Sequence, residues 1–274
     1  MQQQNNNDTI ANAGSMKITM IGAGNVATHI TLALAEKGHT ILQVWSRTAE
    51  HAGKLAERVG AASLVELGEI SPDADLYLFC VKDDALPQVI TAMPETGGIW
   101  VHTAGSLPME LFATRKSDYG VIYPLQTFSR NRELSFQEIP LFIEGSTPAN
   151  AAMLEQLAQA LSHIVYRLPG DKRKKLHLAA VFACNFVNHL YALSAEILNE
   201  EELPFDVLLP LIAETAAKVR EMAPVAAQTG PALRGDEKVM QQHLDQIVDP
   251  HVREIYRLLS GSIADLTKRN HLLT

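Results

Sequence analysis

The chain has 274 residues, enough for one large domain or two ordinary ones, and its composition of 47% hydrophobic and 20% charged residues is typical of a globular protein with a full apolar core. The formal net charge of −8 comes from 23 basic and 31 acidic residues, and no basic face stands out, which argues against a nucleic-acid-binding protein. Two cysteines make no disulfide framework, and the sequence has no metal-ligand spacing, so neither disulfides nor a metal are expected.

Residues 1–15 are rich in Gln and Asn and lack both the apolar core of a secretory signal and the arginines of a transit peptide. They predict a disordered tail. We find no run of about 18 apolar residues in the sequence, so no membrane span is predicted. A cytoplasmic location follows from these two expectations.

The stretch from residue 17 to residue 37 organises the rest of the chain. Residues 17–21 predict a short buried strand, and the amphipathic run 26–37 predicts a helix. Between them Gly22 would permit a tight turn, Gly24 would let a pyrophosphate approach the backbone, and the small Ala27 would let the helix pack closely. The free N–H groups of the helix start favour an anion, so the motif predicts dinucleotide binding, with a purely structural turn as the alternative. The expected phosphate-binding residues are Gly22, Ala23, Gly24, Asn25 and Val26.

The tip of the second predicted strand, residues 40–45, indicates which dinucleotide binds. In folds that prefer NAD, an Asp or Glu at this tip holds the ribose 2′-hydroxyl. Here Ser46 and Thr48 offer hydroxyls and Arg47 offers a guanidinium, groups that suit a 2′-phosphate. The tip therefore predicts NADP, and the alternative is a solvent-facing arginine in a loop.

A helix over 49–58, a short strand over 61–64 and a strongly apolar strand over 75–81 follow. Ligands bind beyond the carboxyl ends of such strands, so Val81 and Lys82 are expected beside the cofactor. The alternative is a helix N-terminus capped by Asp83 or Asp84.

The next predicted strand, residues 99–103, places His102 near its carboxyl end. An imidazole there could face substrate or satisfy a backbone carbonyl, and both alternatives stay open. After it, Thr103 and Ala104 are expected to contact the cofactor and Ser106 the substrate.

An apolar strand over 119–123 leads into a polar loop over 124–129. Tyr123, Gln126 and Thr127 are the candidate substrate-binding residues of this segment. Strands over 141–144 and 164–168, with a helix over 148–161 between them, complete the alternating half.

Pro169 and Gly170 break this alternation, and the sequence beyond them predicts helices alone, over 172–200, 207–222, 237–248 and 250–267. The predicted organisation is a tail over 1–15, a nucleotide-binding domain over 16–168 and an all-helical domain over 169–274. The charge run 171–175 is interpreted as a solvated helix face.

Five segments carry a family resemblance: Gly22–Ala27, Val101–Ser106, Tyr123–Phe128, Leu178–Phe186 and Thr229–Asp236. With them the chain resembles 6-phosphogluconate dehydrogenase, ketopantoate reductase, prephenate dehydrogenase and pyrroline-5-carboxylate reductase. It resembles most a bacterial family of Rossmann-like NADP oxidoreductases with a C-terminal domain of unknown function. The resemblance implies an α/β Rossmann-like, doubly wound, mostly parallel sheet, followed by an all-α domain like the C-terminal domain of 6-phosphogluconate dehydrogenase. It also implies an NADP cofactor and a homodimer formed through the helical domain.

One departure from these relatives concerns the long helix. Several relatives carry a catalytic Lys four residues before an Asn, and here Asn185 matches the Asn while Val181 stands in place of the Lys. At 100° per residue, His177, Val181, Cys184 and Asn188 lie on one stripe with Asn185 at its edge. We expect the polar members of this stripe to line a cleft between the domains, close to His102 or to residues 123–128. The alternative is a helix–helix interface whose polar residues pair with each other.

The sequence thus leads us to expect an oxidoreductase that transfers a hydride between NADP(H) and a small carbonyl, hydroxy acid or imine. The candidate proton donor is His177, supported by Asn185 and Asn188, while His102 and Gln126 orient the substrate. The missing Lys favours the alternative, a non-catalytic NADP-binding sensor or partner protein. We expect a small-molecule substrate and a second copy of the chain as partners, and neither nucleic acid nor a membrane.

Overall fold

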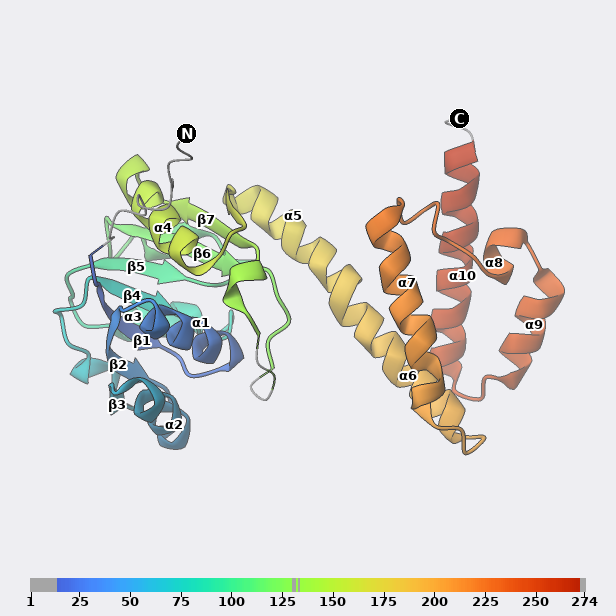
Figure 1. Cartoon of the computed structure of the whole chain (residues 1–274), viewed down its shortest axis with the longest axis horizontal. Helices are drawn as coiled ribbons and strands as arrows, with labels where there is room; N and C mark the ends of the chain where they lie inside the picture. Colours follow the sequence, from blue (N-terminus) through green and yellow to red (C-terminus); the bar gives the residue numbers. More distant parts are fainter. Residues whose placement is uncertain (1–13, 130–131, 133, 272–274) are drawn as a thin grey trace, which may run out of the picture. The chain divides into compact units, whose positions relative to one another are not determined.

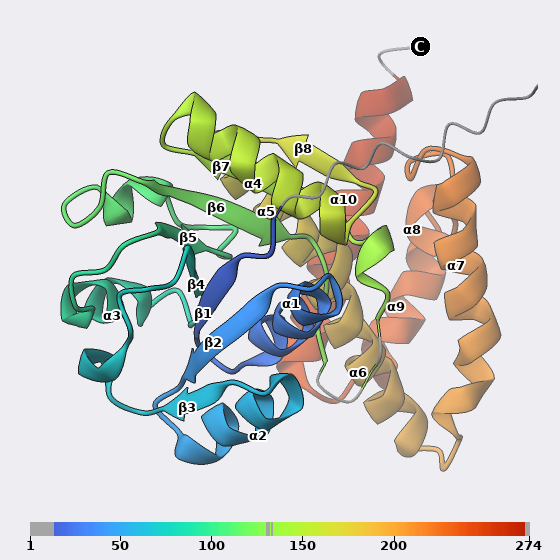
Figure 2. The ribbon, with the colours of Figure 1, turned by 60° about the vertical axis from the view of Figure 1, so that its left-hand side comes forward.

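The strands predicted from the sequence form a single sheet in the order β3-β2-β1-β4-β5-β6-β7-β8 (Figures 1 and 2). The computed structural model describes residues 14–129, 132 and 134–271, and within them β7 runs antiparallel to β6 while the other neighbouring strands are parallel. The strands are β1 (Lys17–Ile21), β2 (Thr40–Trp45), β3 (Ala62–Leu64), β4 (Leu76–Phe79), β5 (Ile99–His102), β6 (Tyr119–Pro124), β7 (Leu141–Gly145) and β8 (Val165–Arg167). The expected doubly wound, mostly parallel sheet is confirmed.

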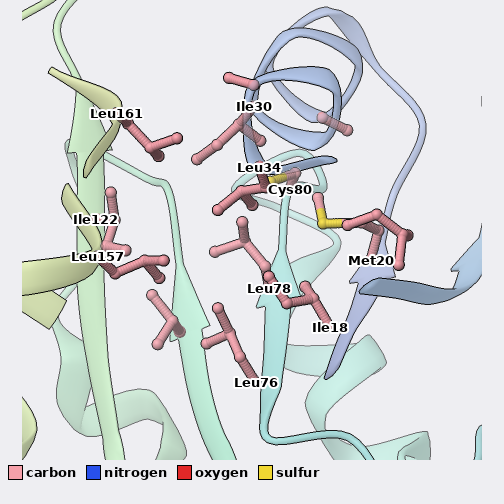
Figure 3. Packing of buried hydrophobic residues seen from close by; sticks show 14 of the residues in the cluster. Ile18, Met20, Ile30, Leu34, Leu76, Leu78, Cys80, Ile122, Leu157 and Leu161 are labelled. Carbon is pink, nitrogen blue, oxygen red and sulfur yellow. The ribbon is translucent and has the colours of Figure 1, made fainter. Parts of the chain in front are cut away.

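Helices cover both faces of this sheet because successive strand residues point to opposite sides. On one face Ile18, Met20 and Leu78 pack with residues of α1, α2 and α4 (Figure 3). On the other face Phe79 and Trp100 pack with residues of α3 and the turn η2. The elements of these two layers are α1 (Asn25–Glu36), α2 (Ala49–Val59), α3 (Leu86–Ala92), α4 (Pro148–Leu161), η1 (Leu67–Glu69), η2 (Met109–Phe112) and η3 (Phe136–Glu138).

Helix α4 shows how local sequence sets the elements beside the site. Thr147 caps its N-terminus by accepting a hydrogen bond from the backbone N–H of Asn150 at 3.1 Å, and Pro148 occupies the first turn, where its missing N–H costs nothing. The helix lies against β6, β7 and β8 (Figure 2). It therefore holds the edge of the sheet from which the long helix departs.

The chain divides into two compact units, the first ending at Cys184 and the second beginning at Asn185. This division lies beyond the boundary expected at 168/169, because the first turns of the long helix pack with the sheet. The tail expected over 1–15 lies almost entirely outside the described residues, which begin at Gly14.

All described residues beyond β8 that enter regular structure are helical, as expected. The helices are α5 (Gly170–Ala180), the π-helical segment η4 (Val181–Phe186), α6 (Val187–Asn199), η5 (Phe205–Leu208), α7 (Leu209–Glu221), α8 (Pro231–Arg234), α9 (Glu237–Gln246) and α10 (Pro250–His271). The short α8, which begins just after Gly230, was not predicted because four residues are too few for a periodic pattern.

The helix from Gly170 to Asn199 is long and apolar enough to cross a membrane by length and composition, and none of its apolar window is buried in the structure. The sequence expectation missed it because Asn185, Asn188 and His189 interrupt the apolar residues without adding a charge. Length and composition do not establish a span, since core helices of globular proteins meet the same criteria.

Candidate functional site

The turn between β1 and α1 has a backbone that requires glycine at one position and leaves open space at another. Gly22 has a φ of 124°, and a Cβ there would lie 2.3 Å from the carbonyl oxygen of Cys80. At Gly24, which is exposed, an added Cβ would meet no atom within 4 Å. Gly22 thus lets β1 turn tightly against the end of β4, and Gly24 keeps the outer side of the turn free.

The N-terminus of α1 suits an anion. Within the described part of the chain no side chain caps it and its first turn holds no acidic residue, so its N–H groups and dipole are available to a negative charge. Asn25 Nδ2 donates to the carbonyl of Phe128 at 2.8 Å, and His29 Nε2 lies 3.0 Å from the carbonyl of Ser129. These contacts hold the loop after β6 beside the turn, which fits a pyrophosphate.

The tip of β2 presents a cation to solvent. Ser46 Oγ accepts a hydrogen bond from the N–H of Thr48 at 3.3 Å, which shapes the turn, and Arg47 is exposed. Among the described residues Arg47 has no ion-pair partner. An unpaired guanidinium at this place is available to a 2′-phosphate.

The loops after β4 and β5 are joined by a hydrogen bond that Ser106 Oγ donates to Asp83 Oδ2. Helix α3 follows Ala85 without a side-chain cap, so capping by Asp83 or Asp84 is not observed. Thr103 and Ala104 are half-buried at the end of β5; at the end of β4 Val81 is half-buried and Lys82 exposed.

His102 faces the protein interior, and the hydrogen bond that it makes is with a backbone N–H and not with the expected backbone carbonyl. Its side chain is fully buried beside the ring of Phe112, and its Nδ1 accepts a hydrogen bond from the N–H of Ala104 at 3.1 Å. Burial, assisted by the Arg173 charge and opposed by the Pro108 carbonyl, lowers the pKa of His102 from 6.5 to about 3. The expectation that His102 orients substrate or takes part in catalysis is therefore corrected: it is a neutral imidazole that shapes the loop after β5.

His177 meets Tyr123 over Gly105. The Tyr123 hydroxyl and His177 Nδ1 lie 3.1 Å apart and share a hydrogen bond whose donor depends on the His177 tautomer. A Cβ at Gly105 would lie 2.8 Å from both His177 Nδ1 and Tyr123 Cζ, so only glycine admits this contact. The expected proximity of His177 to residues 123–128 is confirmed, while its chemical role stays a prediction.

Arg173 lies one turn before His177 and is fully buried. Its Nη1 donates to Glu144 Oε2 at 2.5 Å, its Nη2 donates to the carbonyl of Leu107 at 2.7 Å, and Glu144 Oε1 accepts from the N–H of Gly170 at 2.9 Å. The interpretation of residues 171–175 as a solvated face is wrong for Arg173, although its charged neighbours are exposed.

The other expected site residues on the loop after β6 and farther along the long helix are exposed. Gln126 and Thr127 are exposed, and Gln126 Oε1 accepts from the N–H of Thr127 at 2.8 Å within its own loop. Asn185 and Asn188 are exposed and belong to the second unit. The π-helical segment η4 breaks the assumed 100° per residue, so the expected alignment of Asn188 with His177 does not hold.

Sequence reasoning missed Gly105, Glu144 and Arg173. Arg173 stands four residues before His177, a spacing that puts both on one helix face and could have linked them. Nothing local marks Glu144 or Gly105, because their importance depends on strands brought together by the fold.

Family models match both parts of the chain. Residues 17–102 match the family described as NADP oxidoreductase, coenzyme F420-dependent, and residues 139–263 match a domain of unknown function, DUF2520. A curated glutamyl-tRNA reductase of Idiomarina loihiensis is 41% identical over 70 residues, which is 25% of this chain and 16% of that protein. This match thus spans about a sixth of the curated relative.

Solved structures resemble nearly the whole chain. A crystal structure from Bacteroides fragilis, titled a "putative NADP oxidoreductase", is 49% identical, with a TM-score of 0.86 over 92% of this chain and 98% of that one. A reductive aminase of Aspergillus terreus, in complex with NADPH and ethyl-5-oxohexanoate, is 19% identical with a TM-score of 0.71, covering 93% and 95% of the two chains. An imine reductase of Myxococcus stipitatus in complex with NADP+ is 18% identical with a TM-score of 0.61, covering 92% and 93%.

At under 25% identity the last two likenesses show the fold alone, whereas the first shows the family. NADP is accordingly the cofactor, in agreement with the open, uncapped turn at Gly24. The chain belongs to the NADP oxidoreductases in which a nucleotide-binding segment of the coenzyme F420-dependent type is followed by a DUF2520 domain.

Proposed function

We propose that this NADP-dependent oxidoreductase transfers a hydride between NADP(H) and a small carbonyl, hydroxy acid or imine. In this proposal Tyr123 and His177 transfer the proton that accompanies the hydride. The observation that supports this proposal is the contact of the Tyr123 hydroxyl with His177 Nδ1, 3.1 Å apart, beside the carboxyl end of β5. Ligands of doubly wound sheets bind at that end of the strands.

NADPH supplies the hydride when it is bound. In this proposal the turn from Gly22 to Val26, including Ala23 and Asn25, binds the pyrophosphate, and Ser46, Arg47 and Thr48 bind the 2′-phosphate. Val81, Lys82, Thr103 and Ala104 flank the nicotinamide from the ends of β4 and β5.

Tyr123 is suited to donate a proton because it keeps one at neutral pH. Burial raises the pKa of Tyr123 above 10, the charge of Arg173 opposes this, and Asp83 adds to it. His177 is half-buried, so it can return a proton from solvent to the hydroxyl. Ser106 and the loop residues Gln126 and Thr127 are the proposed contacts for orienting substrate.

The helical unit is proposed to form a homodimer, since its apolar side chains are exposed in the single chain. Burial in such a dimer would account for the apolar helix from Gly170 to Asn199 without a membrane. We further propose that the enzyme works in the cytoplasm.

The decisive experiment follows NADPH absorbance with a panel of keto acids, aldehydes, ketones supplied with an amine, and cyclic imines. We expect oxidation with one of these classes, and a loss of about 10²–10⁴-fold in kcat for Tyr123→Phe and His177→Gln, the range for a lost general acid. Tyr166→Phe is the matched control, because Tyr166 is 55% exposed.

A protein that binds NADPH tightly yet oxidises it with no substrate class would instead be a non-catalytic sensor, the function that Val181 in place of Lys favours. Full activity in both Tyr123→Phe and His177→Gln would refute the proton-transfer assignment while leaving the oxidoreductase in place.

A further inference from the structure

Arg173 joins three segments of the first unit. It stands on α5, its Nη1 donates to Glu144 on β7, and its Nη2 donates to the carbonyl of Leu107 in the loop after β5. Glu144 also accepts from the N–H of Gly170, at the start of α5. The first turn of α5 is thereby held against two separate parts of the sheet.

Stability alone does not explain this arrangement. Arg173 is 0% exposed, and within the described residues its Nε has no partner. Taking such a charge out of water is costly, and apolar residues that fill the same space are often as stable or more stable. We therefore look for a role of this buried arginine other than stabilising the fold.

The loop after β5, which Arg173 binds at Leu107, also meets His177 at Gly105. His177 follows Arg173 by four residues, so both side chains leave the same face of α5. Gly105, on which the His177 ring rests, lies two residues before Leu107, whose carbonyl Arg173 binds. A shift of α5 against this loop would change the distance from His177 to Tyr123.

We propose that Arg173 is a positioning residue, which fixes the register of α5 against the loop after β5 so that His177 meets the Tyr123 hydroxyl. The proposal rests on the function proposed for that pair, but the position of His177 can be measured without any substrate. Glu144 shares the role, because it orients the guanidinium and binds the start of α5.

The charges around the pair make a second variant informative. The charge of Arg173 lowers the pKa of Tyr123, whereas the charge of Asp83 raises it. Glu144 forms an ion pair with Arg173. Arg173→Met removes both the charge and the hydrogen bonds. Arg173→Lys keeps the charge but cannot reach Glu144 and Leu107 with a planar, two-pronged group.

The test combines nitrogen-15 NMR of labelled histidines with kinetics on the full chain. The His177 Nδ1 signal is assigned by its loss in His177→Gln, and Tyr123→Phe gives its position without the hydrogen bond. In both Arg173 variants we expect the signal to move to its Tyr123→Phe position, with NADPH affinity unchanged. With a substrate from the panel, kcat is expected to fall by about 10²-fold, the scale of a misplaced catalytic group, with KM little altered.

Arg167→Met is the matched control, because Arg167 pairs with Glu155 on the same unit and is 52% exposed. It should leave the histidine spectrum and kcat as in the wild type. If Arg173→Met does not fold, Arg173→Lys decides. A folded variant with the wild-type His177 signal overturns the positioning role, whereas a moved signal with unchanged kcat overturns the function proposed for the pair.

Discussion

His102 makes the stability of the first unit depend on pH. Its pKa in the folded chain is about 3, against 6.5 for an ordinary histidine, because the buried ring resists protonation. The unfolded chain therefore binds the proton first as the pH falls. The stability that His102 contributes is complete above pH 6.5 and is lost as the pH falls from 6.5 toward 3.

His102→Asn is expected to remove this pH-dependent part of the stability, because Asn does not titrate. The variant should keep the fold, since an Asn oxygen can still accept a hydrogen bond from the N–H of Ala104. At 1.36 kcal/mol per pH unit, the wild type loses about 2 kcal/mol more than the variant between pH 6.5 and pH 5, measured by urea unfolding. His39, whose pKa burial also lowers, contributes in the same direction in both proteins. His163→Asn, at an exposed position, should keep the wild-type slope; equal slopes for His102→Asn would refute the argument.

Arg47 is the proposed contact of the NADPH 2′-phosphate. One charge-assisted hydrogen bond is worth about 1.5–3 kcal/mol, so Arg47→Ala should weaken NADPH binding by at least about tenfold and leave NADH binding unchanged. Calorimetric titration with both cofactors measures this. Arg58→Ala, another exposed arginine of the same unit, serves as control. A variant at position 47 that keeps its preference for NADPH would place the 2′-phosphate elsewhere.

At the scale of elements, two glycines of the turn from β1 to α1 are expected to have different roles, Gly22 in stability and Gly24 in NADPH binding. Gly22→Ala puts a Cβ 2.3 Å from the Cys80 carbonyl on a backbone with φ of 124°, so we expect a lower melting temperature. Gly24→Ala meets no atom of the chain within 4 Å and should melt like the wild type. If the pyrophosphate binds as proposed, the added methyl group stands in its way, so we expect weaker NADPH binding.

Thermal melts without NADPH and titrations with it distinguish these two effects. Gly53→Ala is the control, because an added Cβ there also meets nothing within 4 Å and lies inside α2. Unchanged NADPH affinity in Gly24→Ala would show that the phosphates do not approach this turn.

Helix α5 and the segment η4 show where prediction from sequence stops at this scale. The long helix follows from its composition, but the switch to π-helical hydrogen bonding over Val181–Phe186 depends on packing and leaves no mark in the periodicity. The projected stripe through His177 and Asn188 failed for that reason. The burial of Arg173 was equally hidden, because Glu144 is distant in the chain and only the fold brings it close.

For the whole molecule, the sequence predicts the strands and the mostly parallel sheet well, because each βα unit carries its own apolar run and turn signal. The order of the strands in the sheet comes from the structure. The turn from β1 to α1 is likewise local, so the places of Gly22 and Gly24 in it could be predicted. His102 could not, since its two alternatives differ only in burial, which Phe112 and neighbouring strands determine. The contact of Tyr123 with His177 was not predicted as such, because the sequence left His102 and residues 123–128 as alternative neighbours of His177 and only the fold selects between them.

The exposed apolar residues of the helical unit predict that the chain forms a homodimer. Leu211 on α7 is 63% exposed and Leu258 on α10 is 65% exposed, and further apolar residues of both helices are exposed in the single chain. Such apolar surface is typical of an interface, where truncating one central side chain can cost about 2 kcal/mol or more. Light scattering at micromolar concentration should give twice the mass of the chain for the wild type. Leu211→Glu and Leu258→Glu should shift it toward the monomer with the helical content kept, as judged by circular dichroism. Val65→Glu changes an exposed apolar residue of the first unit and should remain a dimer; a wild type that scatters as a monomer would rule out the homodimer.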